Sequence, residues 1–192
     1  MIKLSLPNNT YAAGQKVLLH TCCAPCSSAI LECMLQNKMQ PIVYFSNSNI
    51  YPLAEYEKRK QELIRHLQTL NVTFIEDDYN HQQWLDFVRG LENEPERGIR
   101  CSKCFLFRLS RAAKKANELG IHYLTTTLAS SRWKDINQIN KAGLLAVSDI
   151  EDLLFWEQNW RKGGLQERRN QLLKELGFYN QQYCGCEFSI RT

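Results

Sequence analysis

Long apolar segments are missing from this chain of 192 residues. No stretch reaches the roughly 18 apolar residues that a membrane-spanning helix requires. Residues 1–11 also lack the basic segment and apolar run of a secretory signal. We therefore expect a cytoplasmic protein without a membrane partner. Internal repeats and low-complexity tracts are absent too, which favours an ordinary globular chain.

Glycine is missing from the segment that follows the first apolar run, Lys16–His20. This segment reads Thr21-Cys22-Cys23-Ala24-Pro25. A phosphate-binding loop at such a place needs glycines, because they let backbone amides approach the phosphate. The sequence therefore argues against an ATP-dependent enzyme that carries such a loop.

Cysteine, by contrast, occurs eight times. Structural disulfides are rare in a reducing cytosol, so metal binding or redox chemistry is the favoured role. Cys22, Cys23 and Cys26 lie where a strand is expected to end and a helix to begin, and Cys101 and Cys104 open a later helix. Cys22 and Cys23 are poorly placed to bond each other, because adjacent Cα atoms lie about 3.8 Å apart, below the usual disulfide range.

The helix start that carries Cys101 and Cys104 favours anionic sulfur. Unpaired N–H groups and the positive helix end should lower the pKa of the thiols there, which favours thiolates or a metal cluster. The two helix starts together offer five candidate ligands, and four thiolates complete either an all-cysteine zinc site or a cubane iron–sulfur cluster. Spacing alone does not separate zinc from iron–sulfur, and ordinary buried thiols are the weaker alternative for Cys101 and Cys104.

The remaining candidate side chains allow less specific interpretations. In Cys184-Gly185-Cys186 the glycine permits the bend of a reversible disulfide, although further metal ligands or a chance pair explain it equally well. Cys33 falls on an apolar helix face and is expected in the core. His20 borders the cysteine segment, but a hydrogen-bonded histidine at a strand end is favoured over a metal ligand. Asp77 is expected in a solvated turn.

Apolar periodicity predicts alternating strands and helices through residue 128, hence parallel βαβ units. We expect an α/β, doubly wound, mainly parallel sheet of Rossmann-like type. One domain would span residues 1–192, with 148–192 as a helical C-terminal extension carrying the Cys-Gly-Cys pair. Ligands collect at the carboxyl ends of such strands, where Cys22 and Cys23 fall. The expected strands are 16–20, 42–45, 72–75 and 123–128, and the expected helices are 25–39, 53–70, 81–91, 101–119, 134–147 and 164–176.

The formal net charge of +4 is compatible with a nucleic-acid partner. The span 97–115 contains seven Lys or Arg residues and no acidic residue, which predicts a cationic surface beside Cys101 and Cys104. A second segment mixes aromatic and basic side chains and fits either an RNA surface or a helix that buries two tryptophans. It comprises Trp156, Trp160, Arg161, Lys162, Arg168 and Arg169.

Four separated motifs resemble, in order, those of one enzyme family. They are His20-Thr21-Cys22-Cys23-Ala24-Pro25-Cys26, Glu55-Tyr56 with Arg59, Arg100-Cys101-Ser102-Lys103-Cys104-Phe105 with Arg108-Leu109, and Tyr183-Cys184-Gly185-Cys186. The family is that of the cobalamin-independent epoxyqueuosine reductases, QueH. The resemblance extends over nearly the whole chain.

This resemblance implies a fold similar to the adenine-nucleotide α-hydrolase group and a [4Fe–4S] cluster. The implied activity is the last step of queuosine biosynthesis, the reduction of epoxyqueuosine to queuosine in tRNA, with electrons from a donor that stays unidentified. Carried over by motif, the cluster ligands are Cys22, Cys23, Cys101 and Cys104, and the redox-active pair is Cys184 and Cys186. The family is also thought to hold an additional iron, for which Cys26 is the first candidate ligand.

Three departures from the family pattern concern substrate contacts more than metal chemistry. Asn47-Ser48-Asn49 stands where Asn-Pro-Asn is usual, and Ser131-Arg132 stands where Ser-Pro is usual. Asn180-Gln181 precedes Gln182, where an arginine is common. Substrate-binding residues stay unassigned. The alternatives are a non-catalytic, zinc-stabilised RNA-binding module or another iron–sulfur tRNA-modifying enzyme.

Overall fold

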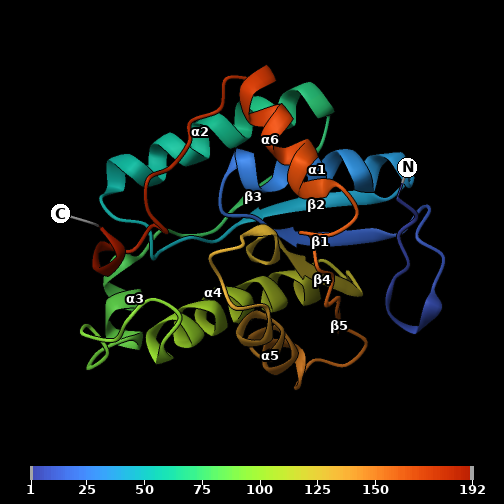
Figure 1. Cartoon of the computed structure of the whole chain (residues 1–192). Helices are drawn as coiled ribbons and strands as arrows, with labels where there is room; N and C mark the ends of the chain where they lie inside the picture. The colour runs from blue at the N-terminus through green and yellow to red at the C-terminus, as the bar shows by residue number, and fades with distance from the viewer. Residues whose placement is uncertain (1, 191–192) are drawn as a thin grey trace.

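The computed structural model describes residues 2–190. Its centre is a five-stranded sheet in which all strand pairs are parallel (Figure 1). The strands lie in the order β3-β2-β1-β4-β5. In the central strand Val17, Leu18 and Leu19 are fully buried, as expected for a continuous apolar run covered on both faces. The strand bounds are β1 Lys16–His20, β2 Gln40–Phe45, β3 Thr73–Glu76, β4 Tyr123–Thr126 and β5 Leu154–Phe155.

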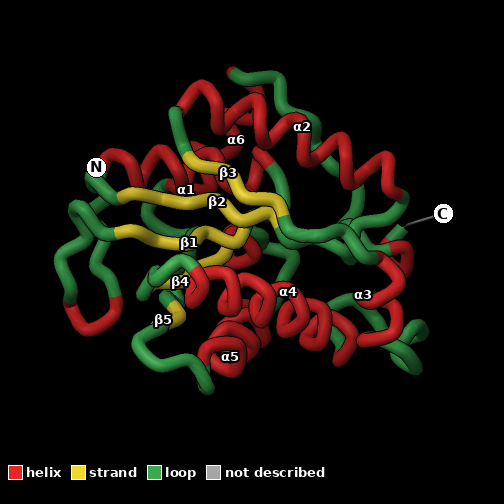
Figure 2. Tube along the Cα trace, turned by 180° about the vertical axis from the view of Figure 1, so that it is seen from behind, coloured by secondary structure: helices red, strands yellow, loops and turns green. Residues whose placement is uncertain are grey.

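Helices cover both faces of the sheet (Figures 1 and 2). One layer holds α1 (Ala24–Gln36), α2 (Leu53–Leu70) and α6 (Leu165–Glu175), and the other holds α4 (Ile99–Glu118) and α5 (Ile136–Val147). The short α3 (His81–Phe87) lies beside α4, and single 3-10 turns occur at Pro7–Asn9, Thr127–Ser130 and Glu187–Ser189. This arrangement confirms the predicted doubly wound α/β fold. Within residues 2–190 no helix is long and apolar enough to cross a bilayer.

The strand order creates a switch point at β1. The chain runs outward from β1 to β2 and β3, then returns to place β4 on the other side of β1. Ligands of such sheets bind in the crevice at the carboxyl ends of the strands where the order reverses. A hydrogen bond connects the two strands at this crevice. The backbone amide of Cys22, directly after β1, donates to Oγ1 of Thr127, directly after β4, at 3.2 Å.

Several element ends differ from the predicted ones for local reasons. Strand β4 ends at Thr126, because its Oγ1 accepts from Leu128 N at 3.1 Å and starts a 3-10 turn. Helix α5 begins after Asp135, whose Oδ1 caps the amide of Asn137 at 2.8 Å. Helix α3 ends at Phe87 rather than at residue 91. Strand β5 was not predicted at all, since two residues carry no periodicity.

Part of the predicted cationic surface is buried instead. Arg100 and Arg108 are each 2% exposed, and Arg111 forms an ion pair with Asp77. The turn at Asp77 is therefore not solvated as predicted, and the Ser46 hydroxyl also donates to its carboxylate at 2.6 Å. The predicted tryptophan pair is buried as well: Trp156 and Trp160 pack edge to face in the core, outside any helix.

The contact between α5 and β5 yields a stability prediction. A Cβ on Gly143 would lie 2.3 Å from the Phe155 ring, so Gly143→Ala forces the ring to move. We expect a loss of about 1–3 kcal/mol in the free energy of unfolding, although alanine in a helix interior normally stabilises by about 1 kcal/mol. Urea unfolding followed by circular dichroism measures it.

The control measures the same Gly143→Ala change in a Phe155→Leu background. It compares the Phe155→Leu variant with the double variant that carries both substitutions. In the smaller-ring background the added methyl group should cost less, so the two changes should couple. Unchanged or higher stability of Gly143→Ala alone would contradict the close packing of α5 on β5.

Candidate functional site

Three thiols meet where β1 passes into α1. Cys22 follows the strand, Cys23 is the N-cap residue of α1, and Cys26 lies in the first turn. The Cys23 Sγ accepts from Cys26 N at 3.3 Å, and Pro25 near the helix start leaves no extra unpaired amide. The three Sγ atoms all lie within 4.8 Å of one another, with 3.8 Å between those of Cys22 and Cys23.

This sulfur group is a candidate metal site. All three side chains are buried, and within residues 2–190 no other three His, Cys, Asp or Glu side chains bring ligand atoms so close together. Thiolates bind zinc and the iron of iron–sulfur clusters. The sequence placed Cys22, Cys23 and Cys26 at one strand end, and the structure brings their three sulfur atoms into one close group.

Hydrogen bonding within the group favours a thiolate at one position. Contacts with the Cys23 and Cys26 thiols hold the pKa of Cys22 well below its usual range, helped by Arg108 and Lys134. The contact with Cys22 raises the pKa of Cys26 to about 12, and burial raises the pKa of Cys23. Negative charge therefore concentrates on Cys22, at the positive end of α1.

Two buried or half-buried cations balance this charge. The Arg59 side chain is 1% exposed. Burial lowers its pKa, but the charge of Cys23 and the hydrogen bond to Glu55 raise it above its usual value overall. Burial also lowers the pKa of Lys134, but the nearby thiols of Cys184 and Cys22 raise it above its usual value. Both cations therefore stay charged beside the thiol group.

A cavity of about 800 Å³ opens onto the thiol group and brings distant cysteines together. Five of the eight cysteines line it, namely Cys22, Cys26, Cys101, Cys184 and Cys186. The β1–α1 junction, the start of α4 and the C-terminal segment thus contribute sulfur to one space.

Cys104 is not among the residues that line the cavity. It packs with Trp84, Phe107 and Cys186 in a small apolar cluster. Burial raises the pKa of Cys104 to about 12 and also raises the pKa of Cys101. The prediction that the helix start lowers both pKa values is therefore wrong, because desolvation outweighs the helix end.

The C-terminal segment is held against α2 by Arg59. Its guanidinium donates to the carbonyls of Cys184 at 3.1 Å and Tyr183 at 3.3 Å. Gly185 accepts from Tyr51 N at 2.9 Å and has a φ of 137°, in the region that favours glycine. Figure 1 shows this segment descending from α6 past the carboxyl ends of the strands. The Cys-Gly-Cys loop is thus fixed over the site.

Gln181 joins the same segment to the thiol group. Its Nε2 lies 3.3 Å from Cys23 Sγ and 3.6 Å from Cys26 Sγ. Cys184 and Cys186, like the other six cysteines, are free thiols.

Sequence reasoning missed Thr127, Lys134 and the contact of Gln181. Thr127 could have been found, because it follows a predicted strand at the same sheet edge as Cys22. Lys134 and Gln181 carry no such signal, since their place depends on how long connections fold back.

His20 has the structural role that was predicted. Its ring nitrogens lie 2.8 Å from Thr126 Oγ1 and 3.2 Å from the Ser46 carbonyl. Burial and the charge of Arg108 lower its pKa to about 3, so the imidazole is neutral near pH 7. It links the ends of β1, β2 and β4.

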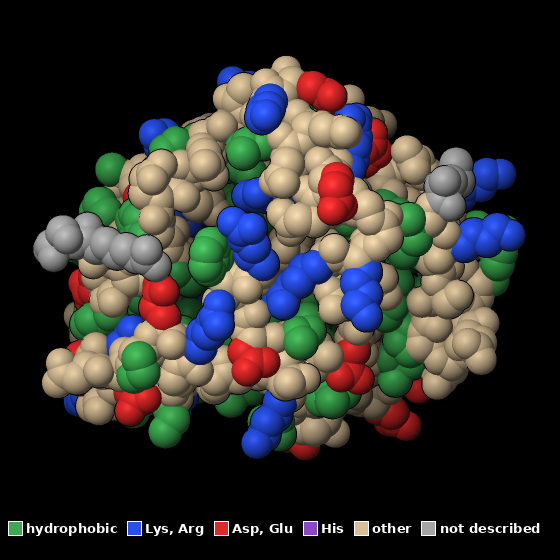
Figure 3. Space-filling model, viewed as in Figure 1, with side chains coloured by type: hydrophobic (Ala, Val, Ile, Leu, Met, Phe, Trp, Pro, Cys, Tyr) green, Lys and Arg blue, Asp and Glu red, His purple; other side chains and the backbone are tan. Residues whose placement is uncertain are grey.

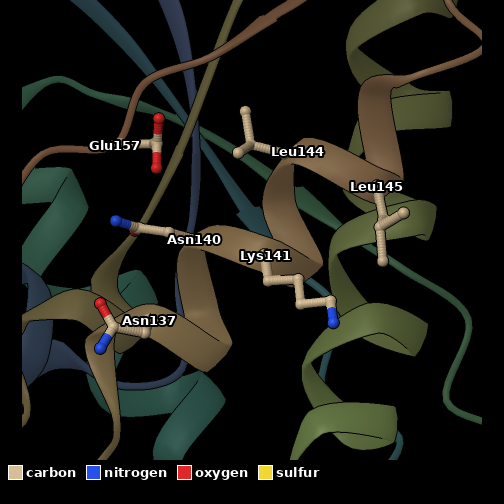
Figure 4. A pocket seen from close by; sticks show the side chains of 6 residues that line it. All are labelled: Asn137, Asn140, Lys141, Leu144, Leu145 and Glu157. Atoms are coloured by element: carbon tan, nitrogen blue, oxygen red, sulfur yellow. The ribbon is translucent and has the colours of Figure 1, made fainter.

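A second hollow of about 490 Å³ lies along α5 (Figure 4). Five of its lining side chains project from α5 and the sixth, Glu157, follows β5. The lining contains no cysteine, so the sulfur chemistry belongs to the first cavity. The α5 residues are Asn137, Asn140, Lys141, Leu144 and Leu145.

The Arg59 contacts predict how exposed the Cys-Gly-Cys loop is. Arg59→Met removes both hydrogen bonds from the guanidinium to the loop. If the free energy that favours the closed loop falls by about 1 kcal/mol, the open fraction of the loop rises about fivefold. We expect alkylation of Cys184 by iodoacetamide, followed by mass spectrometry, to accelerate by at least about that factor. Arg65→Met on the exposed side of the same helix is the control, and buried Cys33 is the internal reference.

Equal acceleration at Cys33 would indicate general unfolding, and no acceleration at Cys184 would contradict the role of Arg59 as a clamp.

Comparisons with known proteins identify the family of this chain. Residues 17–192 match the family model described as epoxyqueuosine reductase QueH. The chain is 46% identical over 189 residues to the epoxyqueuosine reductase QueH of Histophilus somni, covering 98% of this chain and 76% of that protein. Its counterpart from Haemophilus influenzae is 45% identical with the same coverage, and that from Thermotoga maritima is 34% identical over 91% of this chain and 90% of its own length. The chain belongs to the QueH family.

Proposed function

We propose that this protein is an epoxyqueuosine reductase, which removes the epoxide oxygen of epoxyqueuosine in tRNA and leaves queuosine. The proposal depends mainly on one observation: in this QueH-family chain, three separate segments bring five cysteines to the same cavity. The cavity lies at the switch point of the sheet, where α/β folds bind their ligands.

The residues present fit a thiolate-ligated metal group. The donor set is soft, buried and flanked by the cations Arg59 and Lys134, which offset the negative charge of ligating thiolates. We assign the ligands of a [4Fe–4S] cluster to Cys22, Cys23, Cys101 and Cys104. Cys26, whose Sγ belongs to the same close group, is assigned to an additional iron.

Reduction of an epoxide to an alkene requires two electrons and two protons and releases one water molecule. When bound, the cluster supplies electrons one at a time, and an iron beside it supplies a Lewis acid. The Cys184 and Cys186 dithiol can supply the pair, because forming their disulfide releases two electrons and two protons. An external donor, still to be identified, then returns the disulfide to the dithiol. Lys134 Nζ, on the same cavity wall, can donate a hydrogen bond to the epoxide oxygen.

A zinc-stabilised, non-catalytic RNA-binding module is the second candidate. Zinc–sulfur bonds of about 2.3 Å in a tetrahedron place the sulfur atoms about 3.8 Å apart. The distance of 3.8 Å between Cys22 Sγ and Cys23 Sγ fits this geometry. Metal and acid-labile sulfide analysis of anaerobically purified protein separates the two: zinc without sulfide would favour the module.

Serine substitutions test the assigned roles. Cys22→Ser should abolish both the iron–sulfur absorbance and the conversion of epoxyqueuosine to queuosine in a synthetic RNA, measured by nucleoside mass spectrometry. Cys184→Ser should keep the absorbance and lose at least about 99% of turnover, as expected when a covalent redox partner is removed. Cys33→Ser is the control, because Cys33 is buried and does not line the cavity, and this variant should keep both properties.

Loss of absorbance in both Cys22→Ser and Cys184→Ser would contradict this division of roles. A wild-type protein that holds the cluster and receives electrons from dithionite, yet leaves epoxyqueuosine unchanged, would refute the proposed activity.

A further inference from the structure

One tryptophan is exposed at the mouth of the cysteine cavity. Trp133 is 65% exposed and lines the cavity, whereas Trp84, Trp156 and Trp160 are buried. Exposing a large ring to water forgoes the free energy of its burial. Tryptophan is enriched at interfaces, so an exposed ring beside a polar cavity favours a contact surface over packing.

The backbone that carries Trp133 is fixed, so the ring is presented on a braced segment. Arg97 Nε donates to the Trp133 carbonyl at 2.9 Å, and the Trp133 amide lies 3.4 Å from Ser131 Oγ. Arg161 Nη2 donates to the Lys134 carbonyl at 2.8 Å. These bonds connect the segment to the start of α4 and to the loop before α6. A ligand that stacks on Trp133 would not need to order the backbone first.

Positive charge surrounds the ring. The Arg132 guanidinium lies over the Trp133 ring at 4.8 Å from its centroid. The cavity lining holds five Lys or Arg side chains and two acidic ones. Figure 3 shows basic side chains gathered across the middle of this face, between α6 and α5. The lining cations are Arg97, Arg100, Arg132, Lys134 and Arg169.

The rest of the lining is suited to nucleotides more than to an apolar protein surface. Six amide side chains line the cavity, and each amide both donates and accepts hydrogen bonds, as base edges and ribose hydroxyls require. An aromatic ring, cations and amides together are what single-stranded RNA binds. The amides are Gln138, Gln166, Asn170, Asn180, Gln181 and Gln182.

We propose that Trp133 is the base-stacking platform for the RNA loop, holding a nucleotide next to the modified one while Arg132 contacts a phosphate. The inference rests on the proposed function for its substrate, tRNA. It adds the residues that hold the loop at the entrance of the cysteine cavity.

Fluorescence anisotropy of a labelled stem–loop RNA containing epoxyqueuosine tests the platform. Trp133→Ala should weaken binding at least about fivefold, the lower end of base–aromatic stacking, and reduce kcat/KM mainly through KM. Trp133→Phe should recover part of the loss. Arg132→Ala should lower the slope of log affinity against log salt by roughly one.

Two further readouts separate stacking from a structural effect. RNA should quench the tryptophan fluorescence of the wild-type protein and much less that of Trp133→Ala, because the other three tryptophans are buried. Iron and sulfide contents of Trp133→Ala should equal those of the wild type. The matched control is Tyr11→Ala, which removes an 81% exposed ring outside the cavity and should leave affinity unchanged.

Unchanged RNA affinity in Trp133→Ala would refute the proposed role of Trp133 in stacking on RNA. A role of Trp133 in contacting a protein electron donor would give this same result. A wild-type protein that binds the RNA through Trp133 but leaves epoxyqueuosine intact would refute the proposed activity and leave the platform standing. The two failures are therefore distinguishable.

Discussion

The buried guanidinium of Arg108 is the constraint on which the site depends. A cation with 2% exposure needs fixed partners, because an unpaired buried charge is strongly destabilising. Arg108 donates to the Ser46 carbonyl and to Asn47 Oδ1, and Asn47 in turn donates to the Thr21 carbonyl at 2.9 Å. His20 shares the Ser46 carbonyl and stays neutral beside Arg108. Helix α4 and the carboxyl ends of β1 and β2 are thus joined where the chemistry occurs.

The sulfur-rich cavity follows from this arrangement. With β1 fixed, the next residues place Cys22 at the start of α1, and α4 brings Cys101 to the same space. Arg59 then holds the C-terminal loop so that Cys184 completes the wall. Lys and Arg side chains of the cavity lining would stabilise thiolates inside the cavity and RNA phosphates at its mouth. The proposed metal binding and the proposed RNA binding would therefore depend on the same positive field.

Sequence reasoning reached the fold class and the family, both of which are confirmed, because long periodic segments and separated motifs are local signals. It also found the strand end that carries Cys22. It failed where a residue's environment depends on distant partners: Asp77 is paired with Arg111 from α4, and Lys134 reaches the cavity from the segment before α5. The exposed position of Trp133 was not predicted for the same reason, because the residues next to it in the chain do not determine whether its ring is exposed.

Nucleoside mass spectrometry of cellular tRNA tests the central claim most directly. It compares cells that contain this protein with cells from which it has been removed, in a strain without another epoxyqueuosine reductase. The account predicts that removal replaces queuosine by epoxyqueuosine in tRNA and that restoring the protein reverses the change. Queuosine persisting at its normal level after removal would contradict the account.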